Sequence, residues 1–180
     1  MSYLINFLGG RKQSPNTTIF VQTADGIVTN DTAELPLTST GEGSLVFPAN
    51  FFKAGRSLHI IGKGIHSSAG GGNLTIKIKL GSTVILTTGA FASGTDTDAQ
   101  FDIDALLTCR TTGVSGTMMA AGHYEEDGSS PDTFEMKNLS PVTLDTTISQ
   151  TLSVTAQWSS ASAGKILTLQ TLFIEAKNPS

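Results

Sequence analysis

The chain has 180 residues, a length that fits one domain with a core large enough to need no disulfide bonds. Charged residues make up 14% of the chain, below the roughly 25% of typical soluble domains, and the net charge is −4. With 38% hydrophobic residues the chain is not disordered, and without a clustered cationic face it is not expected to bind nucleic acid. The low charge indicates a surface that is either neutral and polar or covered by neighbouring subunits.

The N-terminal segment is apolar and is followed by Gly9-Gly10-Arg11-Lys12. Its apolar residues are Tyr3, Leu4, Ile5, Phe7 and Leu8. No positively charged region precedes them and the run is too short for a signal peptide or a membrane span. The segment is therefore either a first β-strand or tucked tail, or a hydrophobic arm that docks on a neighbouring subunit. We predict an arm at residues 1–17 and one β-sandwich domain at residues 18–180.

Short strands separated by turn residues are predicted next. We expect strands at residues 19–23 and 27–28, with Asp25-Gly26 as a tight turn between them. Residues 32–37 predict an edge strand, because Pro36 cannot donate to a central ladder. A strand at 44–47 ends at Pro48, and residues 50–53 predict a single helical turn.

The clearest pattern lies at residues 73–80, where an apolar residue occupies every second position from Leu74 to Leu80. This alternation places one side of an extended chain on a core and the other in water. It predicts a strand paired with a second one at 83–88. A long strand at 56–67 precedes the pair, with residues 68–72 as a hairpin loop. Residues 90–99 are expected to form a polar connection, followed by strands at 101–107 and 116–124.

Residues 125–138 form the longest stretch without a pattern, and a loop of this length inside a domain is usually functional or disordered. Strands are predicted at 142–145, 150–158 and 165–176. The last has apolar residues on both faces, which predicts a strand covered on both sides, one covering layer being another copy of the chain. No helical period interrupts the pattern. The count of about 8–10 strands predicts an all-β fold, an antiparallel two-sheet sandwich of the jelly-roll type.

Few residues suggest chemistry. Asp96, Asp98, Asp102 and Asp104 offer oxygen ligands for calcium, but their alternation with core residues equally fits the solvated face of a strand. The three histidines, His59, His66 and His123, lie far apart with no companion ligand at metal-site spacing. There is no glycine-flanked nucleophile elbow, and no helix follows Gly70-Gly71-Gly72 as a phosphate cradle requires. We therefore predict no enzyme activity, no metal and no cofactor.

Two single residues complete the inventory. Cys109 is the one cysteine, so no intrachain disulfide forms, and we expect a plain buried thiol suited to a reducing cytosol. Trp158 either packs in the core or an interface, or is exposed and stacks on sugar rings.

Four segments resemble a known group of proteins. They are Phe47-Pro48-Ala49-Asn50-Phe51-Phe52 leading to Gly55-Arg56-Ser57-Leu58-His59-Ile60, Leu74–Gly81, Leu107–Gly113 and Gln150–Trp158. Together they resemble β-rich virion proteins encoded by tailed bacteriophages, and the likeness covers most of residues 19–176. Its motifs are strand and turn residues, so no catalytic or binding residue is carried over.

The resemblance implies a non-enzymatic virion protein, first of all a capsid decoration (cement) protein with a jelly-roll body that stabilises the assembled shell. The expected partners are the major capsid protein or other virion proteins and further copies of the chain, as a trimer, with no membrane. The expected location is the virion, assembled in the host cytoplasm. The candidate partner-binding residues are the five apolar N-terminal residues above together with Glu125, Glu126, Asp127 and Phe134. The alternative is a receptor-binding or fibre module that recognises host surface glycans.

Overall fold

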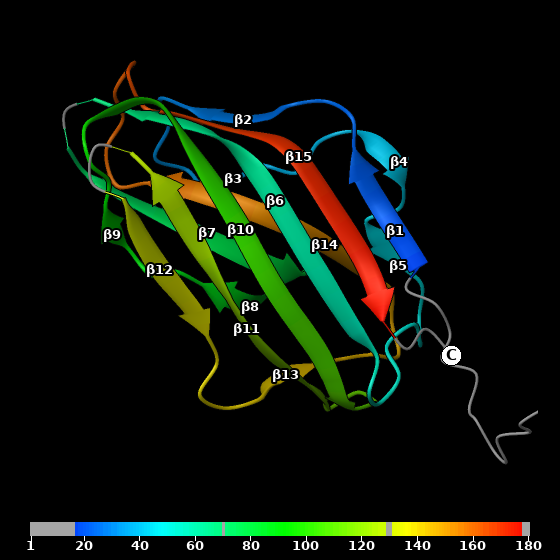
Figure 1. The fold of residues 1–180 in the computed structure, drawn as a ribbon. Coiled ribbons are helices and arrows are strands. Elements are labelled where there is room, and N and C mark those ends of the chain that lie inside the picture. The colour runs from blue at the N-terminus through cyan, green and yellow to red at the C-terminus, as the bar shows by residue number, and fades with distance from the viewer. Residues whose placement is uncertain (1–16, 70, 129–130, 178–180) are drawn as a thin grey trace, which may run out of the picture.

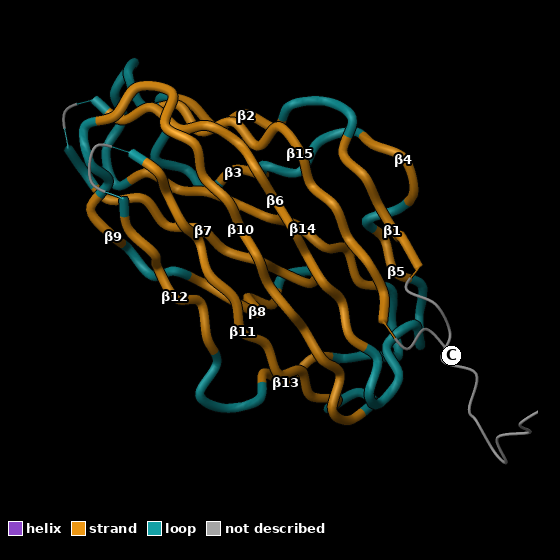
Figure 2. Tube along the Cα trace, in the orientation of Figure 1, coloured by secondary structure: helices purple, strands orange, loops and turns teal. Residues whose placement is uncertain are grey.

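Two antiparallel β-sheets pack face to face in the computed structural model, which describes residues 17–69, 71–128 and 131–177 (Figures 1 and 2). This arrangement is a jelly-roll-like β-sandwich and confirms the predicted fold class. The described residues contain no helix, so the helical turn predicted at 50–53 is wrong; the chain turns there through a hydrogen bond from the Phe51 amide to the Pro48 carbonyl. It follows that no helix in the described part of the chain is long and apolar enough to cross a membrane.

The larger sheet has nine strands. In spatial order they are β12 (Asp132–Lys137), β11 (Gly116–Asp127), β10 (Asp96–Thr111), β6 (Ser57–Ser68), β15 (Ile166–Lys177), β1 (Thr17–Gln22) and β4 (Gly41–Gly43), with β13 (Val142–Leu144) paired to β11 and β2 (Gly26–Thr29) paired to β15. Its long central strands β10, β6 and β15 run side by side in Figure 1.

The smaller sheet has six strands and lies behind the larger one in Figure 1. It orders β3 (Leu35–Pro36), β14 (Gln150–Trp158), β7 (Asn73–Leu80) and β8 (Thr83–Thr87), with β5 (Val46–Phe47) paired to β14 and β9 (Phe91–Ala92) paired to β7. The fifteen described strands exceed the predicted 8–10 because six of them have four residues or fewer.

The strongest sequence pattern is confirmed. Strand β7 covers Asn73–Leu80, and its residues alternate between buried and partly exposed along its whole length. A tight turn at Gly81, where φ is +59°, joins it to β8, and the left-handed conformation favours glycine at this position. The predicted edge strand is also present, because β3 containing Pro36 is the outermost strand on its side of the smaller sheet.

Two predicted connections are wrong. Residues 68–72 do not close a hairpin, because β6 belongs to the larger sheet and β7 to the smaller one, so the loop crosses between the layers. Likewise, β1 and β2 do not pair through Asp25-Gly26; both pair with β15 as two successive pieces of one edge. In both cases a local turn pattern does not determine the partner strand; Gly26 itself begins β2 and Ser68 ends β6.

The stretch at 125–138 is also not a loop. Glu125, Glu126 and Asp127 are the last residues of β11, and β12 begins at Asp132 and returns beside it. The charged residues hid the alternation, since Glu126 is buried and interrupts the expected apolar face. Similarly, the connection predicted at 90–99 contains β9 and the first residues of β10.

A β-bulge in β15 explains its two apolar faces. The pairing with β6 shifts between Leu169 and Thr171, so Gln170 is an extra residue in the strand. Before the bulge Leu167 and Leu169 are buried, and after it Leu172 and Ile174 are buried, all on one side. The apolar residues that alternation assigns to two faces therefore lie, across the bulge, on one face buried in the core, and the bulge points Gln170 outward.

The described chain begins at Thr17 in β1, one residue before the predicted start of the sandwich domain. The five apolar N-terminal residues proposed as an arm lie outside the described residues.

Candidate functional site

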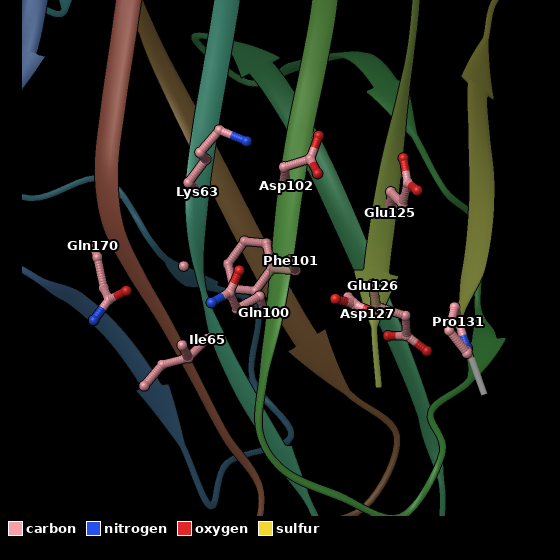
Figure 3. Close-up of a pocket in the computed structure, with 11 residues that line it drawn as sticks. Lys63, Ile65, Gln100, Phe101, Asp102, Glu125, Glu126, Asp127, Pro131 and Gln170 are labelled. Atoms are coloured by element: carbon pink, nitrogen blue, oxygen red, sulfur yellow. The ribbon is translucent and has the colours of Figure 1, made fainter. Parts of the chain in front are cut away.

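The outer face of the larger sheet carries a hollow of about 600 Å³, here called the acidic hollow (Figure 3). It lies at the end of the sandwich where β10 begins and β11 ends (Figure 1). Four of the residues that line it are acidic, namely Asp102, Glu125, Glu126 and Asp127. Among the described residues of the lining Lys63 is the only cation, and Gln100 and Gln170 add amide groups. The hollow is therefore polar and carries an excess of negative charge.

The sheet register brings the carboxylates together. Asp102 of β10 pairs directly with Glu125 of β11 on one side and with Lys63 of β6 on the other. Like charges directly opposite each other in a sheet are destabilising. The positive charge of Lys63 offsets part of the repulsion between Asp102 and Glu125. Figure 3 shows the Lys63 side chain pointing toward Asp102.

Two bulges shape this end of the sheet. One is at Gln170, whose side chain lines the hollow. The other is in β10 between Asp96 and Ala99, where Asp98 has φ of +52° and its side chain accepts a hydrogen bond from Ser67. Bulges commonly redirect side chains next to functional sites, and here they set Gln170 outward and Asp96 inward.

One group of side chains in the described residues could share a metal ion. Donor atoms of Asp102, His123 and Glu125 all lie within 4.8 Å of one another. His123 Nε2 is 3.7 Å from Asp102 Oδ2, but the three side chains are partly or fully open to solvent. Exposed groups of this kind occur often without an ion, and only Asp102 and Glu125 of the three line the acidic hollow.

The other side of the same strands holds a buried polar cluster made of His66, Asp96, Tyr124 and Glu126. His66 Nε2 is 3.7 Å from both Asp96 Oδ2 and Glu126 Oε2, which is too long for a hydrogen bond. Neither ring nitrogen of this fully buried histidine has a hydrogen-bond partner. The Tyr124 hydroxyl donates a weak hydrogen bond of 3.5 Å to Glu126 Oε2.

Burial controls the ionisation of this cluster. The pKa of Glu126 is raised to about 7, mainly by burial and then by the nearby carboxylates of Asp96 and Asp132. Burial also lowers the pKa of His66, an effect that Asp96 partly opposes. The pKa of Tyr124 lies well above its usual value, mainly through burial and then through the charge of Glu126. The cluster therefore resists charge in both its histidine and its glutamate.

The four aspartates considered for calcium do not form one site. Asp102 and Asp104 lie on the outer face of β10, whereas the Asp96 side chain is buried on the inner face. Each of three aspartates instead faces a histidine: Asp96 with His66, Asp102 with His123, and Asp104 with His59 at 3.1 Å. The sequence offered no signal for these pairs, because they depend on the register of β6, β10 and β11.

A second surface feature lies at the opposite end of the sandwich, and it combines the turn from β10 into β11 with segments next to β14 of the smaller sheet. Val46, Val114 and Ile148 are all more than half exposed there, and we call them the apolar end patch. Their loops are tied together: the Thr146 amide donates to the Gly113 carbonyl at 3.0 Å, and the Ser149 hydroxyl donates to the Phe47 carbonyl at 3.0 Å. The patch is thus presented by a connected group of loops.

Two residues considered earlier belong to the interior. Trp158 is fully buried and its indole Nε1 has no hydrogen-bond partner, so it cannot stack on a sugar. Cys109 is a buried free thiol, as predicted, and burial raises its pKa.

The remaining predicted partner-binding residues are divided between the two sides of the sheet. Glu125 and Asp127 are exposed in the acidic hollow, while Glu126 is only 3% exposed. Phe134 is half-buried and its ring stacks on Phe91 at 3.8 Å. The structure thus brings the acidic residues to a concave surface but places Phe134 against the core.

No protein-family model matches the chain, and a search of curated proteins finds no relative.

Proposed function

We propose that the protein is a non-enzymatic structural protein of a bacteriophage virion, a decoration protein that binds and stabilises an assembled capsid. The observation that carries this proposal is the apolar end patch, because apolar residues exposed together on hydrogen-bonded neighbouring segments favour binding to another protein. A sandwich with a single large core supplies a rigid support for that surface. A protein that binds only the assembled shell shifts the assembly equilibrium toward the shell by mass action.

The patch makes the proposal testable on particles. Val114→Asp together with Ile148→Asp places two charges in the patch, and both side chains are exposed, so the fold should survive. Purified protein is added to capsids of the phage that encodes it, and binding is followed by co-sedimentation and by the temperature at which the capsids release DNA. Wild-type protein should bind and raise that temperature, and the double variant should do neither.

Val84→Asp is the control, since Val84 is an exposed valine on β8, a strand that carries no residue of the patch. It should bind capsids as the wild type does. If wild-type protein fails to bind, or if the patch variant binds equally well, the proposal is wrong.

A second candidate function is recognition of host glycans, and the acidic hollow is the observation that favours it. Gln100, Gln170 and Asp102 present amide and carboxylate groups that can orient sugar hydroxyls. Because Trp158 is buried, this site would work without an aromatic platform. Glycan-array binding that is lost in Gln100→Ala and Gln170→Ala would support it, whereas an array with no signal for the wild type would exclude it.

A further inference from the structure

The acidic hollow has an unbalanced charge that calls for a cationic partner. Asp102 and Glu125 oppose each other across β10 and β11, and Asp127 lies two residues further along β11. Lys63 is the one cation in the part of the lining that the structure describes. A cationic side chain placed between the carboxylates would relieve their repulsion and form charge-assisted hydrogen bonds.

An apolar strip borders the hollow on the side of β6, β15 and β2. Thr168 of β15 pairs with Ile65 of β6 and with Ile27 of β2, so the two isoleucines flank it. Ile65 also lines the hollow, and Ile27 and Ile166 are exposed. A partner that fits this surface combines cations with apolar side chains.

The chain itself contains one segment of that composition. Arg11-Lys12 is the only pair of adjacent cationic residues in the sequence, and the apolar run at residues 3–8 comes just before it. Two glycines, Gly9 and Gly10, separate the apolar run from the cations in the sequence.

The geometry favours a segment from another copy. Thr171 of β15 pairs with Lys63, which pairs with Asp102, so these three residues lie in one row across the sheet. Thr17 pairs with Ala176, which lies five residues along β15 from that row. Strand rise and strand spacing put Thr17 about 22 Å from Asp102. Five residues from Lys12 to Thr17 span at most about 18 Å.

The direction of β1 adds to this restriction. The strand runs from Thr17, opposite Ala176, to Val21, opposite Phe173, so it already heads toward the row of the hollow. To reach the hollow of the same protomer, the chain before Thr17 would have to reverse its direction. The five residues from Lys12 to Thr17 are too few for such a reversal and the distance to the hollow together.

We propose that the acidic hollow of one protomer binds Arg11 and Lys12 of a second copy of the chain, with the apolar run at residues 3–8 covering the strip of Ile27, Ile65 and Ile166. The proposal rests on the proposed function, because it supplies the contact between neighbouring decoration subunits. The contact joins two different surfaces, so it is heterologous and closes into a ring where the rotation between subunits permits.

Charge exchange in the full-length protein tests the proposal, with mass measured by sedimentation velocity and light scattering in the absence of capsids. The wild type should be oligomeric. Arg11→Glu with Lys12→Glu, and separately Asp102→Lys with Glu125→Lys, should each be monomeric or associate at least tenfold more weakly. The chain that combines all four changes should regain the wild-type mass, because the interacting charges are exchanged.

The matched control is Asp25→Lys with Glu42→Lys, which changes the net charge by the same amount at two exposed residues outside the hollow. It should remain oligomeric. If the lysine variant of the hollow does not fold, Asp102→Asn with Glu125→Gln takes its place and should weaken association. Far-ultraviolet circular dichroism identifies the folded variants.

A monomeric wild type would overturn the proposal, and so would full association of the Arg11→Glu, Lys12→Glu variant. If the variant with all four charge changes is folded but stays monomeric, that result would also overturn it. Capsid binding through the apolar end patch is measured separately, so failure of one proposal is distinguishable from failure of the other.

Discussion

Replacement of Glu126 by glutamine should make the fold more stable at alkaline pH. Glu126 is buried beside His66 and Asp96, and its pKa is raised to about 7 from its usual 4.5. The folded protein therefore retains this proton at pH values where the unfolded chain has released it. Stability from the protonated group is complete below pH 4.5 and is lost as the pH rises through about 7. Glutamine keeps the shape and cannot ionise, so it removes this loss.

The size of the effect follows from the two pKa values. Each unit of difference corresponds to about 1.4 kcal/mol, so the full contribution is about 3–4 kcal/mol. Between pH 5 and pH 8.5, the linkage relation gives about 2–3 kcal/mol of lost stability in the wild type. For a domain of this size that equals a difference in melting temperature of about 5–10 °C.

His66 acts in the opposite direction, and the comparison of variant with wild type separates the two. Its pKa is lowered by burial, so the unfolded chain binds a proton more readily than the folded one as the pH falls below about 6.5. Both proteins contain this histidine. The difference between their free energies of unfolding therefore reports chiefly on Glu126.

The assay is urea unfolding followed by the fluorescence of Trp158, the single tryptophan, at pH values from 5 to 8.5. The free energy of unfolding of Glu126→Gln relative to wild type should rise by about 2–3 kcal/mol across this range. Glu135→Gln, a change at an exposed residue of the neighbouring strand β12, is the control and should show no comparable rise. A constant difference between Glu126→Gln and wild type at all pH values would refute the argument from burial.

Three further predictions concern other parts of the fold. Glu34 accepts hydrogen bonds from Lys77 and Lys79, which lower its pKa to about 2. The stability that the ionised Glu34 contributes is therefore present above pH 4.5 and is lost as the pH falls through about 2. Glu34→Gln should cost about 1 kcal/mol at pH 7, allowing for partial exposure, and acid unfolding at pH 2–4 should show that the difference from wild type vanishes. Deletion of Gln170 should leave a folded protein, because Leu169 and Thr171 already pair with successive residues of β6. Deletion of Ser153 in β14, which has no bulge, should prevent folding because it shifts the register of the strand by one residue. Soluble expression and circular dichroism compare the two variants. Cys109 should fail to react with a thiol reagent in the native protein and react fully in urea, and rapid labelling without denaturant would contradict its burial.

The alternating strands could be predicted because their signal is local. The apolar period at 73–80 gave β7 with its correct bounds, and Pro36 gave an edge strand, since each depends on residues within a few positions. The fold class followed from the same period repeated along the chain. The pairing of strands was harder to predict from the sequence, because a turn sequence does not reveal which sheet the next strand joins. The loop after β6 is the example.

The candidate site was harder to predict because it depends on register. Glu125 and Asp127 were identified as candidate residues, but as part of a loop, whereas they are outward-facing residues of β11 beside Asp102. Glu126 looked like its neighbours in sequence and is buried on the opposite face. No composition rule distinguishes the three. Only the position of each residue in the β10–β11 ladder does so.

The bulge at Gln170 connects the core of the larger sheet to its outer surface. With unbroken alternation after Leu169, the residues facing the core would be Thr171, Phe173 and Glu175, and the apolar Leu172 and Ile174 would face water. A buried glutamate without a partner and two exposed aliphatic side chains would together cost several kcal/mol. One extra residue avoids both costs and turns an amide outward at the edge of the acidic hollow. The bulge thus has two effects. It breaks the sequence alternation, so that the single buried face of β15 looks like two apolar faces, and it places the amide of Gln170 on the outer face of the strand.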